Sequence, residues 1–334
     1  MFIPTTFATA LVMTILSTIF WGSFANAFKF MKNYRFELYY WDYALGIFIT
    51  SIVLALTMGT IPGGENTFIA NLQVADTTSF IYAAIGGFIF NIANVLLIAG
   101  IEMVGLAIAF PIAIGIALVE GVVLSYLLQP KGNAVLLGAG VIMAVVAVIL
   151  IGKAYSELKG AGDKDKAKDN QTTSKKGVVI CIISGLLMGT FAPFVTKAMT
   201  SEHPLTPYTV GVFFTLGALI SCFFFLTYLM KKPFNGKPVS FSEYTSASMS
   251  NHLLGFLGGS LWCVGTVFNF VAASLVGVAI SYAIGQASPM VASIWGVFVW
   301  HEFRGSNSKA KIYLTGMFIS YILALLLISM AYSG

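Results

Sequence analysis

The chain has 334 residues, of which 58% are hydrophobic and only 9% are charged, with a formal net charge of +5. A soluble domain carries about 25% charged residues, and the mean hydropathy here is +0.88. These values exclude an ordinary soluble protein and predict a chain that lies mostly within a lipid bilayer.

The predicted elements are helices that cross the bilayer. A crossing needs about 20 apolar residues, and no Asp, Glu, Lys or Arg occurs between Tyr244 and His301. The first window has no Lys or Arg before it and is too long for a signal peptide, so we expect it to be retained. The predicted spans are 6–28, 41–60, 77–100, 104–128, 134–152, 177–199, 207–230, 252–275, 277–300 and 311–331. The sequence therefore predicts an all-α integral membrane protein with ten transmembrane helices.

Basic residues give the predicted orientation. Sixteen Lys and Arg fall on one side of the ten spans, in the segments 29–35, 153–176, 231–237 and 304–311, and two fall on the other side. Basic loops face the cytoplasm, so we expect both termini outside, in a multi-pass protein of the plasma or inner membrane. The pI near 9.0 then reflects topology and does not imply a nucleic-acid partner.

The chain divides into two similar halves. Residues 153–176, rich in Lys, Asp, Ser and Gly, are expected to form a flexible cytoplasmic linker between repeats at 1–152 and 177–334. Three pairs of segments match: Phe20 to Ala25 with Leu187 to Ala192, Gly86-Gly87 with Gly258-Gly259, and Val104-Gly105 with Val276-Gly277.

An odd number of spans in each half inverts the second repeat relative to the first. Inverted repeats are typical of secondary transporters, whose halves exchange conformations around a central site. We expect spans 1, 3, 4, 6, 8 and 9 to line that site. The alternatives are a stable duplicated bundle and a non-transporting membrane scaffold or receptor.

Polar side chains within the spans are the candidate functional residues, because such groups are costly in lipid. Glu120 lies about 22 Å along span 4 at 1.5 Å per residue and is the candidate proton-coupling group. Its alternatives are a side chain that reaches the interface or a structural acceptor. Charges between Arg35 and Tyr43 are expected to lie in a solvated loop, although an ion network there could latch the inward face.

The candidate substrate-binding residues combine amides with aromatic rings. Such a set suits a neutral ligand with carbonyl, amide or hydroxyl groups and a stackable face, although amides also join helices. The candidates are Trp21, Asn91, Asn94, Trp262, Thr266, Asn269, Tyr282 and Gln286. Asn26 is expected at the inward gate with Trp21.

No enzymatic motif is visible. The three cysteines lack CxxC spacing, and HExxH, GxSxG and P-loop patterns are missing, so no cofactor, metal site or catalytic residue is expected. The expected partners are a small-molecule substrate, protons and membrane lipids.

Several segments resemble the ureide permease family of the drug/metabolite transporter superfamily, with the glucose/ribose porters as relatives. They are Arg35 to Tyr43, Gly86 to Asn94, Val104 to Leu106, Phe191 to Pro193, and Ser293 to Gly305. The resemblance implies a proton-coupled importer of allantoin, uracil or related heterocycles, with a sugar:proton symporter as second candidate and an exporter of metabolites or drugs as third. Plant members carry a longer central loop with a nucleotide-binding-like motif that residues 153–176 lack, and Glu120 matches no family motif.

Overall fold

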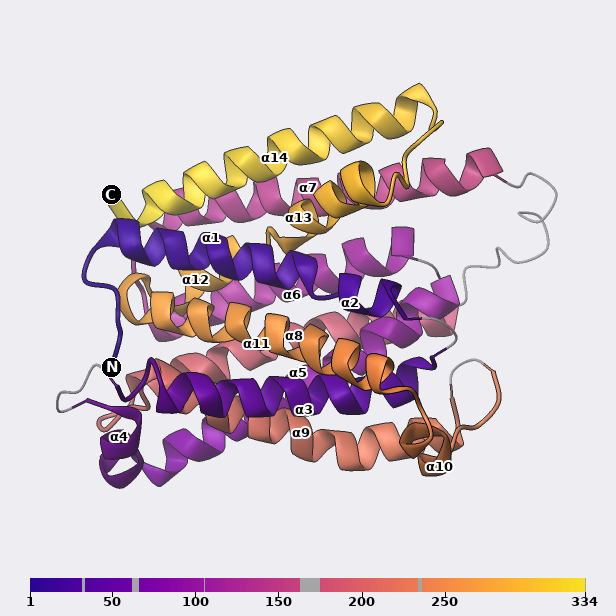
Figure 1. Ribbon diagram of the computed structural model, residues 1–334. Helices are drawn as coiled ribbons and strands as arrows, with labels where there is room; N and C mark the ends of the chain where they lie inside the picture. Colours follow the sequence, from indigo (N-terminus) through magenta and orange to yellow (C-terminus); the bar gives the residue numbers. More distant parts are fainter. Residues whose placement is uncertain (32–33, 62–65, 105, 163–174, 234–235, 334) are drawn as a thin grey trace.

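The computed structural model describes residues 1–31, 34–61, 66–104, 106–162, 175–233 and 236–333. Within these ranges all regular elements are helices, and ten spans are long and apolar enough to cross a membrane. The predicted fold class, an all-helical membrane protein with ten spans, is confirmed (Figure 1).

The helices follow the predicted windows with small shifts at their ends. Two short helices, α4 (Phe68–Val74) and α10 (Phe241–Thr245), lie in the connections. The spanning helices are α1 (Phe7–Ser23) with α2 (Asn26–Lys29), α3 (Phe36–Leu56), α5 (Thr77–Val104), α6 (Leu106–Leu128), α7 (Ala134–Gly162), α8 (Lys175–Thr200), α9 (Pro207–Lys231), α11 (Met249–Val276), α12 (Val278–Gly285) with α13 (Ser288–Ile294) and a π-helix (Trp295–Val299), and α14 (Ser308–Ser333).

Two expectations about segment ends need correction. The predicted linker 153–176 begins as helix, because α7 continues to Gly162 and α8 already begins at Lys175; its central part, 163–174, lies outside the described residues. The second span begins at Phe36 instead of residue 41, so the charged stretch from Arg35 to Tyr43 is mostly helix. Glu37 and Asp42 are buried there, and the expectation of a solvated loop is wrong.

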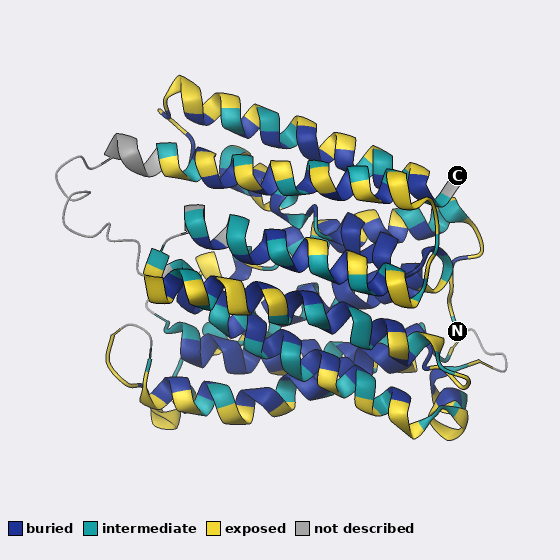
Figure 2. Ribbon diagram, turned by 180° about the vertical axis from the view of Figure 1, so that it is seen from behind, coloured by how far each residue is buried: buried dark blue, intermediate teal, exposed yellow. Residues whose placement is uncertain are grey.

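The helices alternate in direction, so both termini lie at one end of the bundle and α10 lies at the other (Figure 1). Exposed residues follow the outward faces of the peripheral helices (Figure 2). Many of them are large and apolar, such as Phe224 on α9, Ile142 on α7 and Leu326 on α14. A bilayer covers such faces without cost, because lipid tails are as apolar as these side chains.

Two helix crossings between the halves use the same close backbone contact. On α5 and α9, a Cβ at Gly87 would lie 1.7 Å from the Phe214 carbonyl oxygen, and one at Gly217 would lie 1.9 Å from that of Ala84. On α11 and α3, the equivalent distances are 2.0 Å from Gly259 to the Tyr43 oxygen and 2.3 Å from Gly46 to the Phe256 oxygen. Glycine at these points lets the helices approach to backbone contact.

The ninth span is interrupted near its middle. Helix α12 ends at Gly285, and α13 starts at Ser288 with Pro289 in its first turn. The span then widens into the π-helix before its end at Trp300. Prolines and π-helical turns free backbone groups and are frequent at functional sites, and this interruption borders the cavity described next.

Candidate functional site

A cavity of about 210 Å³ lies at the centre of the bundle, between helices of both halves. Its walls come from α1, α5, α6, α8, α9, α11 and the α12–α13 interruption. These include all six predicted spans and, in addition, the seventh. The lining residues are Trp21, Gly22, Phe24, Ala25, Phe90, Asn94, Leu97, Ile114, Met188, Phe191, Phe214, Trp262, Thr266, Gln286, Ser288, Pro289 and Ala292.

Five of the eight predicted substrate-binding residues meet in this cavity: Trp21, Asn94, Trp262, Thr266 and Gln286. They come from four separate helical segments and lie up to 265 positions apart in the chain. All the lining residues are uncharged. Such a lining suits a neutral solute, because an unpaired charge is costly in a low-dielectric cavity.

The two tryptophans form one wall. Their rings lie 6.3 Å apart between centroids at an interplanar angle of 21°, and Phe90 stacks on Trp262 at 4.9 Å. Trp21 Nε1 donates a hydrogen bond of 3.0 Å to Thr266 Oγ1, which itself donates to the Trp262 carbonyl oxygen. The wall is therefore a fixed aromatic surface on which a planar or ring-shaped solute can stack.

Two amides offer hydrogen bonds to a bound solute. Asn94 Nδ2 donates to Tyr40 Oη at 2.9 Å, which leaves its side-chain oxygen for a ligand. Among the described residues, the side-chain amide of Gln286 has no protein hydrogen-bond partner, whereas its backbone N–H donates to the Tyr282 carbonyl oxygen. These amides can pair with both donors and acceptors of a polar solute.

The other three predicted residues tie helices together outside the cavity. Asn91 accepts from Tyr40 Oη at 2.6 Å and donates to Ser221 Oγ at 2.6 Å. Asn269 Nδ2 donates to the Ser281 carbonyl oxygen at 2.8 Å, and Tyr282 Oη donates to that of Ala117 at 3.2 Å. Direct contact of these side chains with substrate stays a prediction.

Glu120 lies apart from the central cavity. It borders an open crevice between α6, α7 and α8 whose other lining residues are apolar. Thr190 Oγ1 donates to Glu120 Oε1 at 3.1 Å, and Glu120 Oε2 is buried without a hydrogen-bond partner among the described residues. The role of Glu120 as the proton-coupling group stays a prediction.

Four of the lining aromatics, Phe24, Phe90, Phe191 and Phe214, were not predicted. One signal was available: Phe24 and Phe191 occupy the same place in the matched segments 20–25 and 187–192, and both line the cavity. If the halves are inverted repeats, as the sequence predicts, matched residues face a central site from both sides. The other two rings carried no signal that distinguishes them from lipid-facing phenylalanines.

The end of the cavity toward Trp300 is bounded by ties between the first and ninth spans. Trp295 Nε1 donates to Ser23 Oγ at 2.9 Å, and Trp300 Nε1 donates to Asn26 Oδ1 at 2.6 Å. Lys29 forms an ion pair with Glu302. Asn26, predicted at the inward gate, thus lies in a contact that movement of the first span must break.

Substitutions at two amides separate binding from structure. We expect Gln286→Leu to weaken solute uptake about tenfold, the value of one lost hydrogen bond of about 1.4 kcal/mol, without lowering the melting temperature. Asn91→Leu should lower the melting temperature because the Tyr40 hydroxyl loses its acceptor and Ser221 Oγ loses the hydrogen bond from Asn91. Uptake and thermal unfolding measured on the same purified proteins check both. Full tolerance at both positions would favour a non-transporting scaffold.

Comparison with known proteins places the chain among transporters. Residues 12–331 match the family model described as sugar transport protein. Ureide permease 1 of Arabidopsis thaliana is 25% identical over 88% of this chain and 89% of its own length. The glucose uptake protein GlcU of Bacillus subtilis (strain 168) is 22% identical over 94% of each chain. The fold of the present chain resembles that of a solved structure titled "Crystal structure of protein", with a TM-score of 0.63 and 14% sequence identity. The match covers 96% of this chain and 97% of the other.

These relatives are permeases and uptake proteins, so the chain is a membrane transporter of small solutes and not an enzyme. The resemblance to ureide permeases, with sugar porters as relatives, is confirmed. By its match over nearly its whole length, the chain belongs to the sugar transport protein family.

Proposed function

We propose that the protein imports a small, neutral, polar solute across the cell membrane, with both termini outside, and that import is coupled to protons. The observation that carries the proposal is the central cavity, whose lining is uncharged and combines an aromatic wall with two available amides. A ureide or nucleobase-like heterocycle is the first candidate substrate. Its carbonyl and N–H groups match the amides of Asn94 and Gln286, and its planar ring matches the wall.

A sugar is the second candidate. Tryptophan also stacks on the apolar face of a sugar, and amides bind hydroxyl groups. The relatives include glucose uptake proteins as well as ureide permeases. Because the same residues serve both ligands, uptake measurements have to separate them.

Alternating access is supported by matched contacts between the halves. The Gly87–Phe214 and Gly217–Ala84 contacts on one side repeat as Gly259–Tyr43 and Gly46–Phe256 on the other. Likewise, α5 packs on α8 as α11 packs on α1, and α6 packs on α8 as α12 and α13 pack on α1. These pairs are the ones expected of two inverted repeats, 1–152 and 177–334, that exchange conformations around the cavity.

The test is uptake into proteoliposomes of labelled allantoin, uracil and glucose, with and without an inward proton gradient. Accumulation of one compound driven by the gradient supports coupled import and identifies the substrate class. Outward movement against the gradient would favour the alternative of an exporter. No flux of any compound, together with tolerance at Gln286, would favour a scaffold or receptor.

Glu120 is the proposed carrier of the coupled proton. We expect Glu120→Gln to abolish proton-driven accumulation while leaving counterflow exchange intact, because glutamine keeps the hydrogen bond from Thr190 but cannot exchange a proton. The same proteoliposomes measure both processes. Val119→Gln, a polar change at the neighbouring exposed position, is the control, and unchanged accumulation in Glu120→Gln would remove Glu120 from the mechanism.

A further inference from the structure

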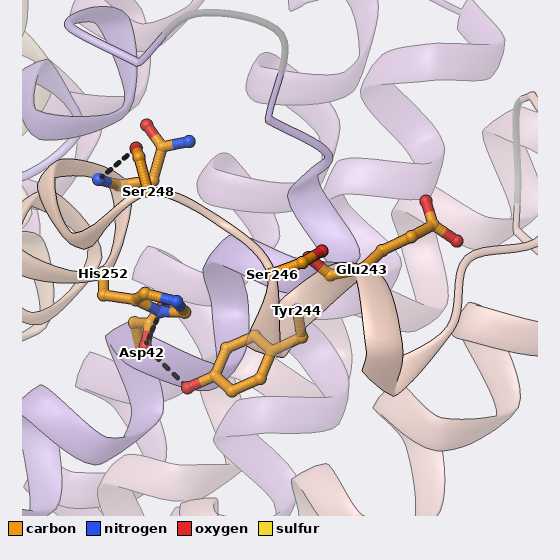
Figure 3. A network of polar contacts seen from close by, with 7 residues as sticks. Asp42, Glu243, Tyr244, Ser246, Ser248 and His252 are labelled. Atoms are coloured by element: carbon orange, nitrogen blue, oxygen red, sulfur yellow. Dashed lines mark hydrogen bonds and ion pairs between the residues drawn. The ribbon is translucent and has the colours of Figure 1, made fainter.

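A polar cluster lies at one end of the bundle, where α3, α10 and α11 meet (Figure 3). Asp42 on α3 is 6% exposed. Its carboxylate oxygens Oδ1 and Oδ2 both lie 3.0 Å from His252 Nδ1 on α11, and Oδ1 accepts a 2.7 Å hydrogen bond from Tyr244 Oη on α10. The three side chains converge from elements up to 210 positions apart. None of them lines the central cavity.

The chemistry of this cluster is that of a proton site. A buried carboxylate requires compensating donors or a positive charge, and histidine is the side chain that ordinarily gains or loses charge between pH 5 and 8. The His252 side chain is 22% exposed, so water can reach it. Burial raises the pKa of the Tyr34 and Tyr244 phenols, with the Asp42 carboxylate as a further cause, so both rings stay neutral in this range.

Neighbouring charges have partners of their own. Arg35 pairs with Glu37, and Lys29 on α2 pairs with Glu302. Glu243 on α10 accepts from Ser240 and points away from the pair (Figure 3). The remaining ionisable groups on α3, α9 and α11 are Tyr39, Tyr40 and Tyr43 on α3, Tyr208, Cys222, Tyr228 and Lys231 on α9, and Cys263 on α11. Lys232, which directly follows α9, lies over the Tyr228 ring.

The matched crossing of α5 and α9 carries two phenylalanines in place of the Asp42–His252 pair. Asp42 and His252 lie four residues before Gly46 and Phe256, which contact each other where α3 crosses α11. Where α9 crosses α5, Phe213 and Phe80 lie four residues before the contacting pair Gly217 and Ala84. Phe80 and Phe213 also touch each other, with ring centroids 4.5 Å apart. Two matched crossings therefore carry a titratable pair at one end of the bundle and an aromatic pair at the other.

We propose that Asp42 and His252 form a proton-binding site, separate from Glu120, whose charge state sets how firmly α3 and α11 are held together at this end of the bundle. With a protonated imidazole the pair is an ion pair and the contact is tight. With a neutral imidazole the contact keeps at most a hydrogen bond and loosens. Trp262, which lies ten residues from His252 along α11, about 15 Å at 1.5 Å per residue, lines the cavity together with Thr266.

The consequence for transport rests on the proposed function. The basic segments place this end of the bundle on the cytoplasmic side. Acid on that side holds α3 to α11, so exchange of solute should slow as the pH there falls and quicken as it rises. The outer aromatic pair gives no such response, which makes the pH sensitivity one-sided.

A double-mutant cycle of Asp42→Asn and His252→Gln, read as melting temperature in detergent at pH 6 and pH 8, tests the site without any substrate. We expect a coupling of about 3 °C at pH 6, the shift that an interaction of about 1 kcal/mol gives, and less than half of it at pH 8. The cycle cancels contributions from groups outside the pair. Equal coupling at both pH values, or none at pH 6, overturns the proposal.

The matched control is the cycle of Phe80→Leu and Phe213→Leu, whose coupling should not change with pH. If Asp42→Asn does not fold, the double variant Asp42→Phe/His252→Phe, which copies the outer pair, takes its place. Its melting temperature should vary between pH 6 and pH 8 less than that of the unaltered protein. Equal variation in both overturns the proposal.

Counterflow exchange in proteoliposomes at internal pH 6 and 8 tests the transport consequence. We expect faster exchange at pH 8 in the unaltered protein and no difference in His252→Gln. Absence of all exchange, with the pH-dependent coupling retained, contradicts the proposed function and leaves the proton site standing. Exchange with the same pH response in His252→Gln contradicts the link between the site and transport.

Discussion

Trp262→Ala should reduce the apparent affinity for the transported solute about 30-fold, which corresponds to about 2 kcal/mol. The indole of Trp262 is 7% exposed, stacks on Phe90 and faces Trp21 across the cavity wall. Its removal takes away the stacking surface and also leaves Trp21 without its aromatic neighbour. Concentration dependence of uptake into proteoliposomes measures the change.

Two variants show whether this effect belongs to the cavity. Trp262→Phe keeps an aromatic face, so its loss of binding free energy should be less than a third of the loss in Trp262→Ala. Phe223→Ala removes a ring that is 61% exposed on the outer face of α9 and should leave uptake unchanged. An unaltered affinity in Trp262→Ala would mean that the solute does not stack on this wall.

Gly87→Ala should destabilise the protein by about 3 kcal/mol or more, the upper range for an overpacked contact. The added Cβ would lie 1.7 Å from the Phe214 carbonyl oxygen. The obstacle is backbone, so no side-chain rotation relieves it and α5 has to move away from α9. Thermal unfolding in detergent should show a lower melting temperature or failure to purify as a monodisperse species.

Gly138→Ala is the matched control. This glycine also lies within a spanning helix, α7, four residues after its start at Ala134, and an added Cβ meets no atom within 4 Å. We expect its melting temperature to be unchanged or slightly higher, because alanine favours helix more than glycine does. If both substitutions lowered the melting temperature equally, helix propensity would explain the result and the close crossing would not.

The site residues were harder to predict than the spans. Asn91 and Asn94 lie three positions apart on α5 and were expected to share one ligand-facing surface. In the structure Asn94 reaches the cavity, whereas Asn91 bonds Tyr40 and Ser221 between helices. A small difference in angle around the helix axis separates a ligand contact from a structural tie, and the sequence contains no measure of that angle.

Glu120 and the Asp42–His252 pair show the same limit from two directions. Glu120 was predicted as the proton-coupling group deep in the fourth span, and it borders an apolar crevice apart from the central cavity. Asp42 was expected in water, yet α10 and α11 cover it. Both outcomes depend on which helix packs against which, and that choice is made by contacts between residues far apart in the chain.

The sequence by itself determined the ten spans, because each needs only about 20 consecutive apolar residues and that property is local. It also determined the likeness of the halves and the residue types available for a neutral ligand. The tertiary structure alone decided which amides face the cavity, where Glu120 lies and that Asp42 meets His252. These depend on the rotation and separation of packed helices, which backbone contacts at glycines such as Gly87 and Gly259 fix across the interface between the halves.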